Sequence, residues 1–582
     1  MGTHGATDLP NDAEEWILPQ YLHEHQLRVY GAFQRPSQGD AEGVMCAISA
    51  FAIAGDVPPP RNNLTSGVRP WIPNCVNTFL LNETLRTAFN SSCFIQSDCC
   101  DSITAIVHHQ WVPTLKEAVA DAVNAGLSAS YGDPSGITAA LTNALADGSI
   151  SETVFAERIQ RTLLTLFRVG VFDTSNPNNP FRGPFDESVL DGAEHRALAR
   201  EAAARTAVLL ENRNGALPLQ ALPAKVAIIG PFSHCTVLHG DYGGHDSDSP
   251  FQCSYGHSYS GTMSKVSTVL TAAEEEAAAA QATVRYAQGS GIRTANSSGL
   301  SDAIAAAQWA DLVILSVGLG SLIEVEGRDR TYLTLPTAQQ DLVDAVAQAV
   351  GPSTRLIITI ASAGGVDLSV PRADAVLQVF YAGEEAGHGL FDVLLGRVNP
   401  SARMPLTVHT NSYLDIAAPL ANFNMIANGV GRTYRYFNDS TYILYRFGYG
   451  LSYCTFTYSQ LSLAADSSGG GVTVSVSVEV NTSAAGQACR EVTQVYLRLP
   501  TSAAVNTPIY SLVGFESTVL PPKGSGPTRL AFHVLLDDLL TTYADGSRSL
   551  AHGTYTFFVS GHLPDDAAGL RQSNSLVGSI VL

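Results

Sequence analysis

Two groups of acidic side chains lie where this chain could carry out nucleophilic or acid–base chemistry. Asp98 directly follows the apolar stretch Cys93–Ser97, and Glu324 and Glu326 lie in the charged stretch Ile323–Arg330. The carboxyl end of a buried parallel strand is where barrel enzymes hold their catalytic groups. An Asp after a strand also often caps the next helix, and a charged stretch is often a solvated loop with local ion pairs. The residues alone leave both interpretations open.

Cysteines and histidines offer a second source of chemistry, but their spacing predicts no metal site. The nine cysteines match no zinc template and no His/Asp cluster has ligand spacing, so we expect neither a metal nor a cofactor. Cys99 and Cys100 could act as nucleophiles, although buried small side chains are the favoured interpretation. Cys235 and Cys253 flank a polar loop that a disulfide could close in an oxidising compartment. The pair His108–His109 is expected to pack locally or to contact a hydroxyl group.

The elements that must position these residues follow three patterns along the chain. Up to about residue 170, short apolar stretches alternate with amphipathic helical stretches, which is typical of parallel strands followed by helices. Between about residues 200 and 410 the alternation predicts a parallel α/β sheet. Beyond about residue 440, segments with a strict period of two predict an antiparallel β-sandwich. The expected strands are Gly43–Ile48, Cys93–Ser97, Val226–Ile229, Leu312–Val317, Leu356–Ala361, Val376–Tyr381, Val472–Val480, Glu491–Leu499 and Thr554–Val559, and the expected helices are Ala118–Ala125, Glu152–Val169, Thr268–Ala282, Ser301–Ala310 and Ala338–Val350.

Length, charge and hydropathy limit the class of protein. The chain has 582 residues, 45% of them hydrophobic and only 15% charged, which predicts a folded protein of several domains. With 33 basic and 53 acidic residues the net charge is −20, which argues against nucleic acid and against membrane surfaces as partners. No apolar stretch reaches the roughly 18 to 20 residues that a membrane span needs. The start of the chain lacks a secretory signal, whereas six N-glycosylation acceptor sites give weak support for an outside location: Asn63, Asn82, Asn90, Asn296, Asn438 and Asn481.

Six motifs occur in a fixed order and carry a resemblance to a known family. They are FIQSDC at 94–99, VLLEN at 208–212 followed by LPL at 217–219, VAIIGP at 226–231, EVEGRDRTYLTLP at 324–336, YAGEEAGHGLFDVLLGRVNPSARMPLT at 381–407 and YRFGYGLSYCTFTY at 445–458. In this order they resemble glycoside hydrolase family 3. The resemblance implies an α/β multidomain fold with a partial (β/α) barrel, then an α/β sandwich, then a C-terminal fibronectin type III-like β-sandwich.

The resemblance also implies domain boundaries. Residues 1–175 are expected to form the C-terminal part of a (β/α)8-type barrel that carries the nucleophile. Residues 221–410 are expected to form the α/β sandwich that carries the acid/base, and residues 451–582 the fibronectin type III-like domain. Residues 176–220 and 411–450 are the expected linkers.

The activity implied by the resemblance is that of a retaining, exo-acting β-glycosidase with an oligosaccharide substrate. By position in the motifs, Asp98 is the expected nucleophile and Glu326 the expected acid/base, with Glu324 as the alternative. Such a pair works when the two carboxyl groups lie about 5 to 5.5 Å apart. The sequences Ser-Asp-Cys and Ile-Glu-x-Glu resemble the β-xylosidase and α-L-arabinofuranosidase branch, so terminal xylosyl residues of xylo-oligosaccharides are the favoured substrate. His4 is an expected sugar ligand, and Tyr242 could face the site or pack elsewhere.

Several positions depart from the family pattern. The family's Lys-His pair aligns with Thr3–His4, its Tyr-Asn with Ile48–Ser49, and an Asp after Ala-Gly-Leu with Ser128. The stretch 52–73 replaces a short turn and reads like translated intervening sequence, and the initiating Met is hypothesised to come from a gene model that starts too late. The family normally has half a barrel before Thr3, so we expect an incomplete barrel that exposes apolar surface. Each lost sugar contact costs about 1 to 3 kcal/mol, which predicts weak or absent turnover.

Two alternative functions stay open on the sequence. One is a β-glucosidase of the same family, against which Cys99 counts because many such enzymes carry Trp there. The other is a non-catalytic carbohydrate-binding remnant, which the lost sugar ligands favour and the retention of Asp98 and Glu326 disfavours. The family and the glycosylation sites imply an extracellular or secretory-pathway location. The sequence gives no oligomeric state.

Overall fold

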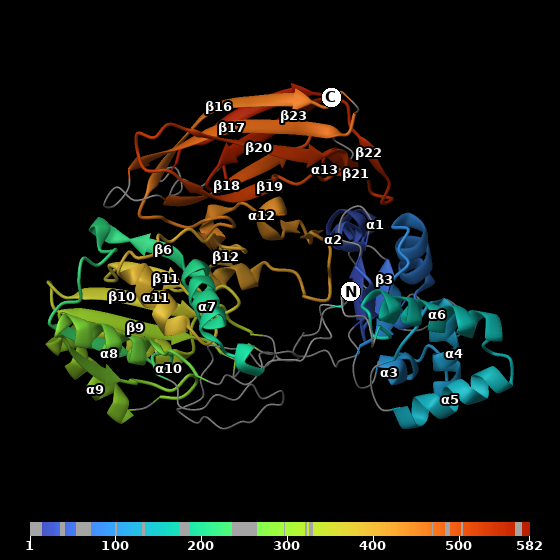
Figure 1. Ribbon diagram of the computed structural model, residues 1–582, viewed down its shortest axis with the longest axis horizontal. Helices are drawn as coiled ribbons and strands as arrows, with labels where there is room; N and C mark the ends of the chain where they lie inside the picture. Colours follow the sequence, from blue (N-terminus) through green and yellow to red (C-terminus); the bar gives the residue numbers. More distant parts are fainter. Residues whose placement is uncertain are drawn as a thin grey trace.

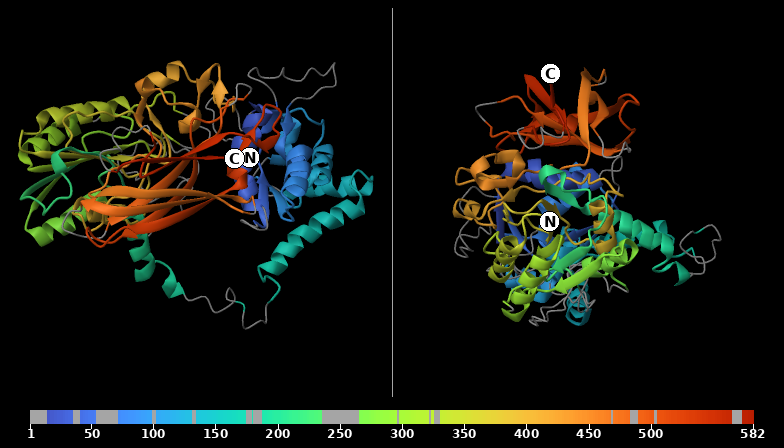
Figure 2. Two further views of the ribbon diagram at one scale, coloured as in Figure 1. Left: turned by 90° about the horizontal axis from the view of Figure 1, so that it is seen from above. Right: turned by 90° about the vertical axis from the view of Figure 1, so that its left-hand side faces the viewer.

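Three bodies make up the computed structural model (Figure 1). We call them the N-terminal domain (residues 14–173), the α/β domain (187–410) and the C-terminal domain (451–582). The first two lie side by side, and the C-terminal domain lies across both (Figure 2). The structure describes residues 14–34, 41–53, 71–98, 102–130, 134–173, 179, 187–234, 265–295, 297–320, 323–324, 330–467, 469–482, 489–501, 505–564 and 573–582.

Short parallel strands and helices form the N-terminal domain. Strand β2 (Gly43–Cys46) pairs in parallel with β5 (Phe94–Ser97), so both expected strands are present. Strand β1 (Glu14–Ile17) pairs in parallel with β3 (Ala50–Ile53). The helices pack on these strands over one apolar core. The remaining elements are α1 (Pro19–Tyr21), the π-helix η1 (Leu22–Gln26), α2 (Leu27–Gln34), β4 (Ile72–Pro73), η2 (Asn74–Val76), the π-helix η3 (Phe79–Ala88), α3 (Ser102–His108), α4 (Leu115–Ala125), α5 (Pro134–Ala146) and α6 (Glu152–Arg168).

Helix α6 leaves part of its apolar side exposed. Ile159, Leu163 and Phe167 recur every four residues along this helix and are 40, 39 and 60% exposed. Residues at this spacing share one face of an α-helix, so the three side chains form a continuous stripe. This stripe agrees with the expectation that the domain exposes apolar surface.

The ends of the unusual stretch 52–73 belong to the fold. Strand β4 pairs with β3 in antiparallel orientation, with Ala50 opposite Pro73 and Phe51 opposite Ile72. Trp71 is buried at 4% exposure, and its ring packs edge-on against Trp16 with 6.2 Å between the ring centroids. Residues 54–70 lie outside the described residues. Both ends of the stretch thus take part in strand pairing or core packing, and its origin as intervening sequence stays a prediction.

A six-stranded sheet forms the centre of the α/β domain. Its strand order is β6-β11-β10-β9-β7-β8, and all neighbours are parallel except β6, which runs antiparallel to β11. The strands are β6 (Val208–Asn212), β7 (Lys225–Ile229), β8 (Thr283–Ala287), β9 (Leu312–Gly318), β10 (Arg355–Ala361) and β11 (Ala375–Gln378). The helices and short turns are η4 (Glu187–Val189), α7 (Ala193–Thr206), η5 (Arg213–Gly215), α8 (Val269–Ala280), α9 (Ser297–Trp309), α10 (Thr337–Ala349) and α11 (Ala386–Leu394). Two apolar cores contain side chains of these strands and helices, so the predicted α/β sandwich is confirmed.

Two details of this sheet differ from the prediction. Strand β6 lies within the expected linker 176–220, yet it forms an edge of the sheet through its pairing with β11. Strand β11 ends at Gln378 rather than Tyr381, because Phe380 has a left-handed backbone with φ of 52° that an extended strand does not allow. The chain therefore turns out of the sheet just before Tyr381.

Two antiparallel sheets form the C-terminal domain, as the alternating pattern predicts. Their orders are β16-β17-β20 and β19-β18-β23-β24. Along β17 (Gly471–Thr482) the even-numbered residues Val472, Val474 and Val476 are fully buried, whereas Thr473 and Ser475 are partly exposed. The other elements are β16 (Thr455–Ala465), β18 (Cys489–Arg498), β19 (Ser511–Leu520), β20 (Thr528–Leu535), α13 (Leu536–Leu539), β21 (Leu540–Thr542), β22 (Arg548–Leu550), β23 (Thr554–Ser560) and β24 (Leu576–Val581).

The connection around residues 411–450 contacts the N-terminal domain. The Trp16 N–H donates to the carbonyl of Ala421 at 3.2 Å, and the Phe423 N–H donates back to the carbonyl of Trp16 at 2.9 Å. Residues of the expected linker thus extend the sheet edge beside β1. The short elements here are β12 (Val408–His409), η6 (Asn411–Asp415), β13 (Ile426–Ala427), β14 (Val430–Gly431), α12 (Thr433–Tyr436), η7 (Ser440–Tyr442) and β15 (Ile443–Tyr445).

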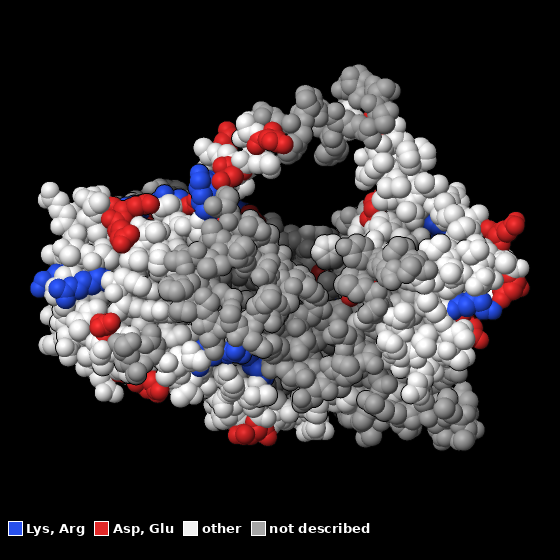
Figure 3. All heavy atoms as spheres, turned by 90° about the horizontal axis from the view of Figure 1, so that it is seen from below, with Lys and Arg blue, Asp and Glu red and all other residues white. Residues whose placement is uncertain are grey.

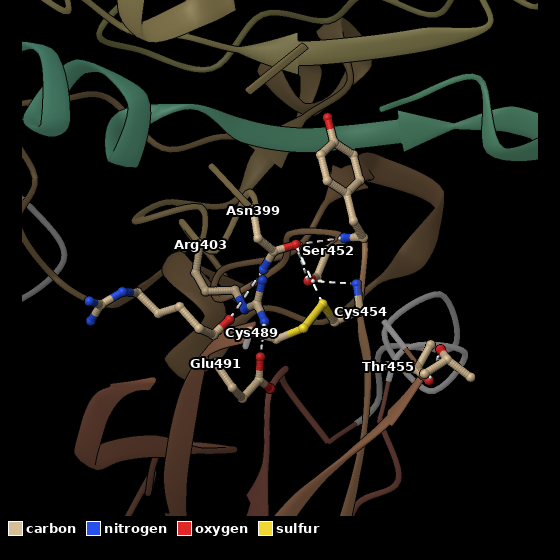
Figure 4. Close-up of a disulfide and its surroundings, with 10 residues drawn as sticks. Asn399, Arg403, Ser452, Cys454, Thr455, Cys489 and Glu491 are labelled. Carbon is tan, nitrogen blue, oxygen red and sulfur yellow. Dashed lines mark hydrogen bonds and ion pairs between the residues drawn. A yellow bond between two sulfur atoms is a disulfide. The ribbon is translucent and has the colours of Figure 1, made fainter. Parts of the chain in front are cut away.

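Two disulfides are present among the described cysteines. Cys46–Cys75 ties the end of β2 to η2, and Cys454–Cys489 ties the entry of the C-terminal domain to β18 (Figure 4). Cys93 is a buried free thiol. Cys99, Cys100, Cys235 and Cys253 lie outside the described residues, so their expected roles stay predictions.

Candidate active site

Asp98 lies at the carboxyl end of strand β5, where the sequence places it. Its backbone N–H donates to the carbonyl of Cys46 at 3.2 Å, which continues the β2–β5 ladder by one residue. The Ser97 hydroxyl donates to the Asp98 carbonyl at 3.0 Å. Asp98 itself is half-buried. The residue is thus held on a rigid strand end while part of it stays accessible to solvent.

A second segment lies beside this strand end. The Ser97 N–H donates to the carbonyl of Ala129 at 3.0 Å, and the Ser128 N–H donates to the carbonyl of Ile95 at 2.8 Å. The hydroxyl groups of Ser97 and Ser130 are 3.3 Å apart. Ser128, at the position where the family pattern has an Asp, therefore lies beside Ile95 of the strand that ends before Asp98. The sequence did not indicate Ser130, although its place two residues after Ser128 on the same extended segment could have done so.

Residues that follow strand β2, the neighbour of the Asp98 strand, make two further contacts. The His109 ring Nε2 lies 3.2 Å from the carbonyl oxygen of Ile48. The Asn74 side-chain amide donates to the Ser49 hydroxyl at 3.1 Å. His109 therefore has a local contact, which agrees with the packing role expected for it. Both contacts fix the segment that directly follows β2, the strand that pairs with the Asp98 strand.

Glu324 follows strand β9 in the α/β domain and has a dense set of hydrogen bonds. Its Oε1 accepts from the Ala363 N–H at 2.5 Å and its Oε2 from the Gly364 N–H at 3.1 Å. The Tyr381 hydroxyl also donates to Oε1 at 2.5 Å. The donors come from the segments that follow β10 and β11. The Glu324 carboxylate therefore links three segments at the carboxyl edge of the sheet.

Tyr381 has a second contact that fixes its phenol group. The Gly320 N–H donates to the Tyr381 oxygen at 2.8 Å, so the hydroxyl accepts one hydrogen bond and donates another. Burial and the nearby negative charge of Glu324 raise the pKa of Tyr381 well above its usual value. The phenol thus keeps its proton at every physiological pH and serves as a permanent donor to Glu324.

The described structure does not bring all the predicted site residues together in one place. Asp98 belongs to the N-terminal domain and Glu324 to the α/β domain, which lie side by side in Figure 1. In the space-filling view from below, the described atoms of these two domains form two groups, with an opening visible between part of them (Figure 3). Glu326, His4 and Tyr242 lie outside the described residues. Their predicted roles stay predictions.

The described residues offer neither a metal-binding cluster nor a membrane-spanning helix. Within the described ranges, no group of three or more His, Cys, Asp and Glu side chains is arranged to hold a metal ion. No described helix is both long enough and apolar enough to cross a bilayer.

Comparison with known proteins identifies the family. Residues 207–453 match the glycosyl hydrolase family 3 C-terminal domain, and residues 491–562 match the fibronectin type III-like domain. The chain belongs to glycoside hydrolase family 3, as its motifs predict.

Curated relatives carry xylosidase names. Beta-xylosidase/alpha-L-arabinofuranosidase 2 of Medicago sativa subsp. varia is 33% identical over 396 residues, which are 66% of this chain and 47% of that protein. Beta-D-xylosidase 3 of Arabidopsis thaliana is 29% identical over 524 residues, which are 84% of this chain and 63% of that protein. The chain thus spans about half the length of the curated relatives that it matches.

Solved structures share the fold. An exo-β-xylosidase of family 3, XlnD, in complex with a xylobiose aziridine probe has a TM-score of 0.80 and 22% identity, over 98% of this chain and 69% of that chain. A family 3 β-glucosidase from Bifidobacterium adolescentis has a TM-score of 0.75 and 23% identity, over 98% of this chain and 74% of that chain. These likenesses confirm the predicted fold class, including its fibronectin-like end.

Proposed function

We propose that this chain is a retaining, exo-acting β-glycosidase that removes terminal xylosyl residues from xylo-oligosaccharides. Asp98 is the proposed nucleophile and Glu326 the proposed acid/base. The observation that carries the proposal is the place of Asp98 at the carboxyl end of a parallel strand in a chain of glycoside hydrolase family 3. The xylosidase names of relatives about 30% identical to this chain support xylose as the sugar.

The proposed reaction has two covalent steps. The Asp98 carboxylate attacks the anomeric carbon while the acid/base gives a proton to the leaving oxygen, so the glycosidic bond breaks and a glycosyl ester forms. The same acid/base then removes a proton from water, which attacks the anomeric carbon and releases the sugar and the Asp98 carboxylate. The rigid end of β5 serves this chemistry, because a nucleophile must be held in line with the reacting carbon.

An aryl β-xyloside assay tests the proposal. We expect purified protein to release the aryl alcohol slowly, because of the sugar contacts that depart from the family pattern, and Asp98→Asn to abolish the release because an amide cannot replace the carboxylate nucleophile. A fluorinated xylosyl donor should add its mass to the peptide that contains Asp98. Asp147→Asn is the matched control, since Asp147 is an exposed carboxylate of the same domain, paired with Lys116 at 2.5 Å. Turnover that survives Asp98→Asn would refute the assigned nucleophile.

The sugar is tested in the same assay. Aryl β-xyloside should be turned over faster than aryl β-glucoside, because the motifs around Asp98 resemble the xylosidase branch. The reverse preference would favour a β-glucosidase, and solved β-glucosidases also share the fold.

A second candidate is a carbohydrate-binding protein without turnover. Ser128 beside the Asp98 strand supports it, because an Asp at that place could accept hydrogen bonds from sugar hydroxyls more strongly than Ser. Titration calorimetry with xylobiose separates the candidates. Binding without turnover and without labelling of Asp98 would favour this second function.

We further propose that the chain is a secreted glycoprotein. Disulfides such as Cys46–Cys75 form and persist in oxidising compartments. The acceptor residues Asn90, Asn438 and Asn481 are exposed, as attachment of a sugar chain requires. Loss of mass on treatment of the native protein with an N-glycosidase is the expected result, and unchanged mass would contradict the proposal.

A further inference from the structure

We propose that Glu324 is a positioning residue and that Tyr381 and Glu324 together anchor the loop that carries the proposed acid/base. This inference rests on the proposed function, because it concerns the residue that performs proton transfer in the same site. It also decides between the two acidic candidates in that loop, Glu324 and Glu326.

The hydrogen bonds of Glu324 argue against a role as proton donor. Oε1 faces the Ala363 N–H and the Tyr381 hydroxyl, and Oε2 faces the Gly364 N–H. A proton on either oxygen would face another donor and would break at least one of these bonds. A general acid must release and regain a proton in every cycle. The arrangement suits a fixed acceptor instead.

Both ends of the loop are fastened to one segment. At its start, Glu324 bonds to Ala363 and Gly364, and at its end the Arg330 guanidinium donates to the carbonyl of Gly365 at 2.9 Å. Glu326 lies between these two contacts in the sequence, two positions after Glu324 and four before Arg330. The contacts at Glu324 and Arg330 therefore hold the chain on both sides of the proposed acid/base.

The segment 363–365 contacts both Glu324 and Arg330, and its glycine at position 364 leaves room for both groups. A Cβ at Gly364 would lie 2.6 Å from an Arg330 Nη atom and 3.3 Å from Oε2 of Glu324. A larger residue would push apart the two groups that hold the loop. Tyr381 reaches Glu324 because the left-handed backbone at Phe380 turns the chain out of β11. The anchor thus joins the ends of β9, β10 and β11, at the edge where α/β sheets hold their sites.

Kinetics of three variants on two substrates test the assignment. Loss of a general acid slows an aryl xyloside with a poor leaving group far more than one with a good leaving group, because the good one departs without a proton. Glu326→Gln should show this difference, and azide should restore its turnover by attacking the anomeric carbon of the Asp98 ester, which releases glycosyl azide and the free carboxylate. Glu324→Gln and Tyr381→Phe should lower kcat/KM for both substrates alike, by about 10- to 100-fold, since a small misplacement of a reacting group has that effect.

The matched control is Tyr453→Phe. Tyr453 also donates one phenol hydrogen bond, to the carbonyl of Val393 at 2.9 Å, but it contacts helix α11 rather than the loop. We expect its kinetics to stay unchanged. Rescue of Glu324→Gln by azide, or a loss that depends on the leaving group, would overturn the inference, and so would a Tyr381→Phe variant as active as the control.

Amide hydrogen exchange separates this inference from the proposed function. If the unaltered protein has no turnover, the proposed function fails, but the anchor can still be measured. Glu324→Gln and Tyr381→Phe should speed exchange in peptides that contain Ala363 and Gly364, relative to Tyr453→Phe, because both N–H groups bond to Glu324. Exchange that does not change in these peptides would refute the anchor.

Discussion

At the level of single residues, the structure explains why one motif position, Gly230, requires glycine. Gly230 in the motif VAIIGP has a backbone φ of 113°, and a Cβ there would lie 2.1 Å from the carbonyl oxygen of Ser316. Position 230 therefore requires glycine for two independent reasons, conformation and close approach. The contact joins the end of β7 to its neighbour β9 at the edge that also holds Glu324.

Gly230→Ala should destabilise the α/β domain. The unfavourable φ and the clash with Ser316 together should lower the free energy of unfolding by about 2 to 4 kcal/mol. Scanning calorimetry of the full chain would record this as a lower transition temperature. Gly429→Ala is the control, because Gly429 has a φ of 77° but no atom within 4 Å of an added Cβ, so only the conformational cost of about 1 kcal/mol applies. Equal losses in both variants would contradict the role of the close approach.

The sequence predicted the acidic candidates but could not assign a role to Glu324. Asp98 was predictable because an apolar stretch and a motif precede it directly. The donors to Glu324 lie 39, 40 and 57 positions further along the chain, at Ala363, Gly364 and Tyr381. Only the folded sheet brings them together. The sequence therefore identified the charged loop and left the roles of its two Glu residues open.

At the level of elements, the periodicity and the apolar content of the sequence predicted many of the strands and helices. The alternation in Val472–Val480 became β17, and the apolar stretch Leu312–Val317 became the fully buried β9. Strand β6 was missed because its residues lie next to the interdomain motif, and its edge position depends on antiparallel pairing with β11. The π-helices η1 and η3 were also missed, because no residue pattern distinguishes them from α-helices.

The π-helix η1 is expected to make stability depend on pH. Burial, and then the positive charge of Arg435, lower the pKa of His25 from 6.5 to about 4. The unfolded chain binds a proton at His25 below pH 6.5, whereas the folded chain does not until about pH 4. Stability should therefore be full above pH 6.5 and fall as the pH decreases toward 4, by about 3 kcal/mol at most. Burial and Arg548 lower the pKa of the neighbouring His23 too, which adds to the same trend.

Thermal unfolding at pH 7.5 and pH 5 measures this dependence. His25→Gln should lose less stability between these two pH values than the unaltered protein, because the variant has no imidazole to protonate. His195→Gln is the control, since His195 is exposed on helix α7. A His25→Gln variant with the same pH dependence as the unaltered protein would show that other groups cause the loss.

At the level of the whole molecule, two buried arginines connect the domains, Arg403 through an ion pair to the C-terminal domain and Arg435 through an ion pair to the N-terminal domain. Arg403 of the α/β domain contacts Glu491 of β18 at 2.7 Å, and both side chains are under 10% exposed (Figure 4). The Tyr458 hydroxyl donates to the same carboxylate at 2.8 Å. Arg435 contacts Glu24 of the N-terminal domain at 2.5 Å and also donates to the Ser511 hydroxyl at 3.2 Å. The C-terminal domain thus bonds to Arg403 of the α/β domain and to Arg435, which also contacts the N-terminal domain.

Removing the charge of Glu491 should therefore affect more than one domain. Glu491→Gln leaves the buried Arg403 guanidinium without its counter-charge, which typically costs about 3 to 5 kcal/mol. Calorimetry should show a lower transition temperature for the C-terminal and α/β domains together, because the interface between them is disturbed. In Arg403→Met/Glu491→Leu no unpaired charge is left, so this double variant should recover much of the loss. Glu201→Gln is the control, because it breaks an exposed pair with Arg205 on one helix, worth less than about 0.5 kcal/mol. If Glu491→Gln were as stable as Glu201→Gln, the buried pair would not couple the C-terminal domain to the α/β domain.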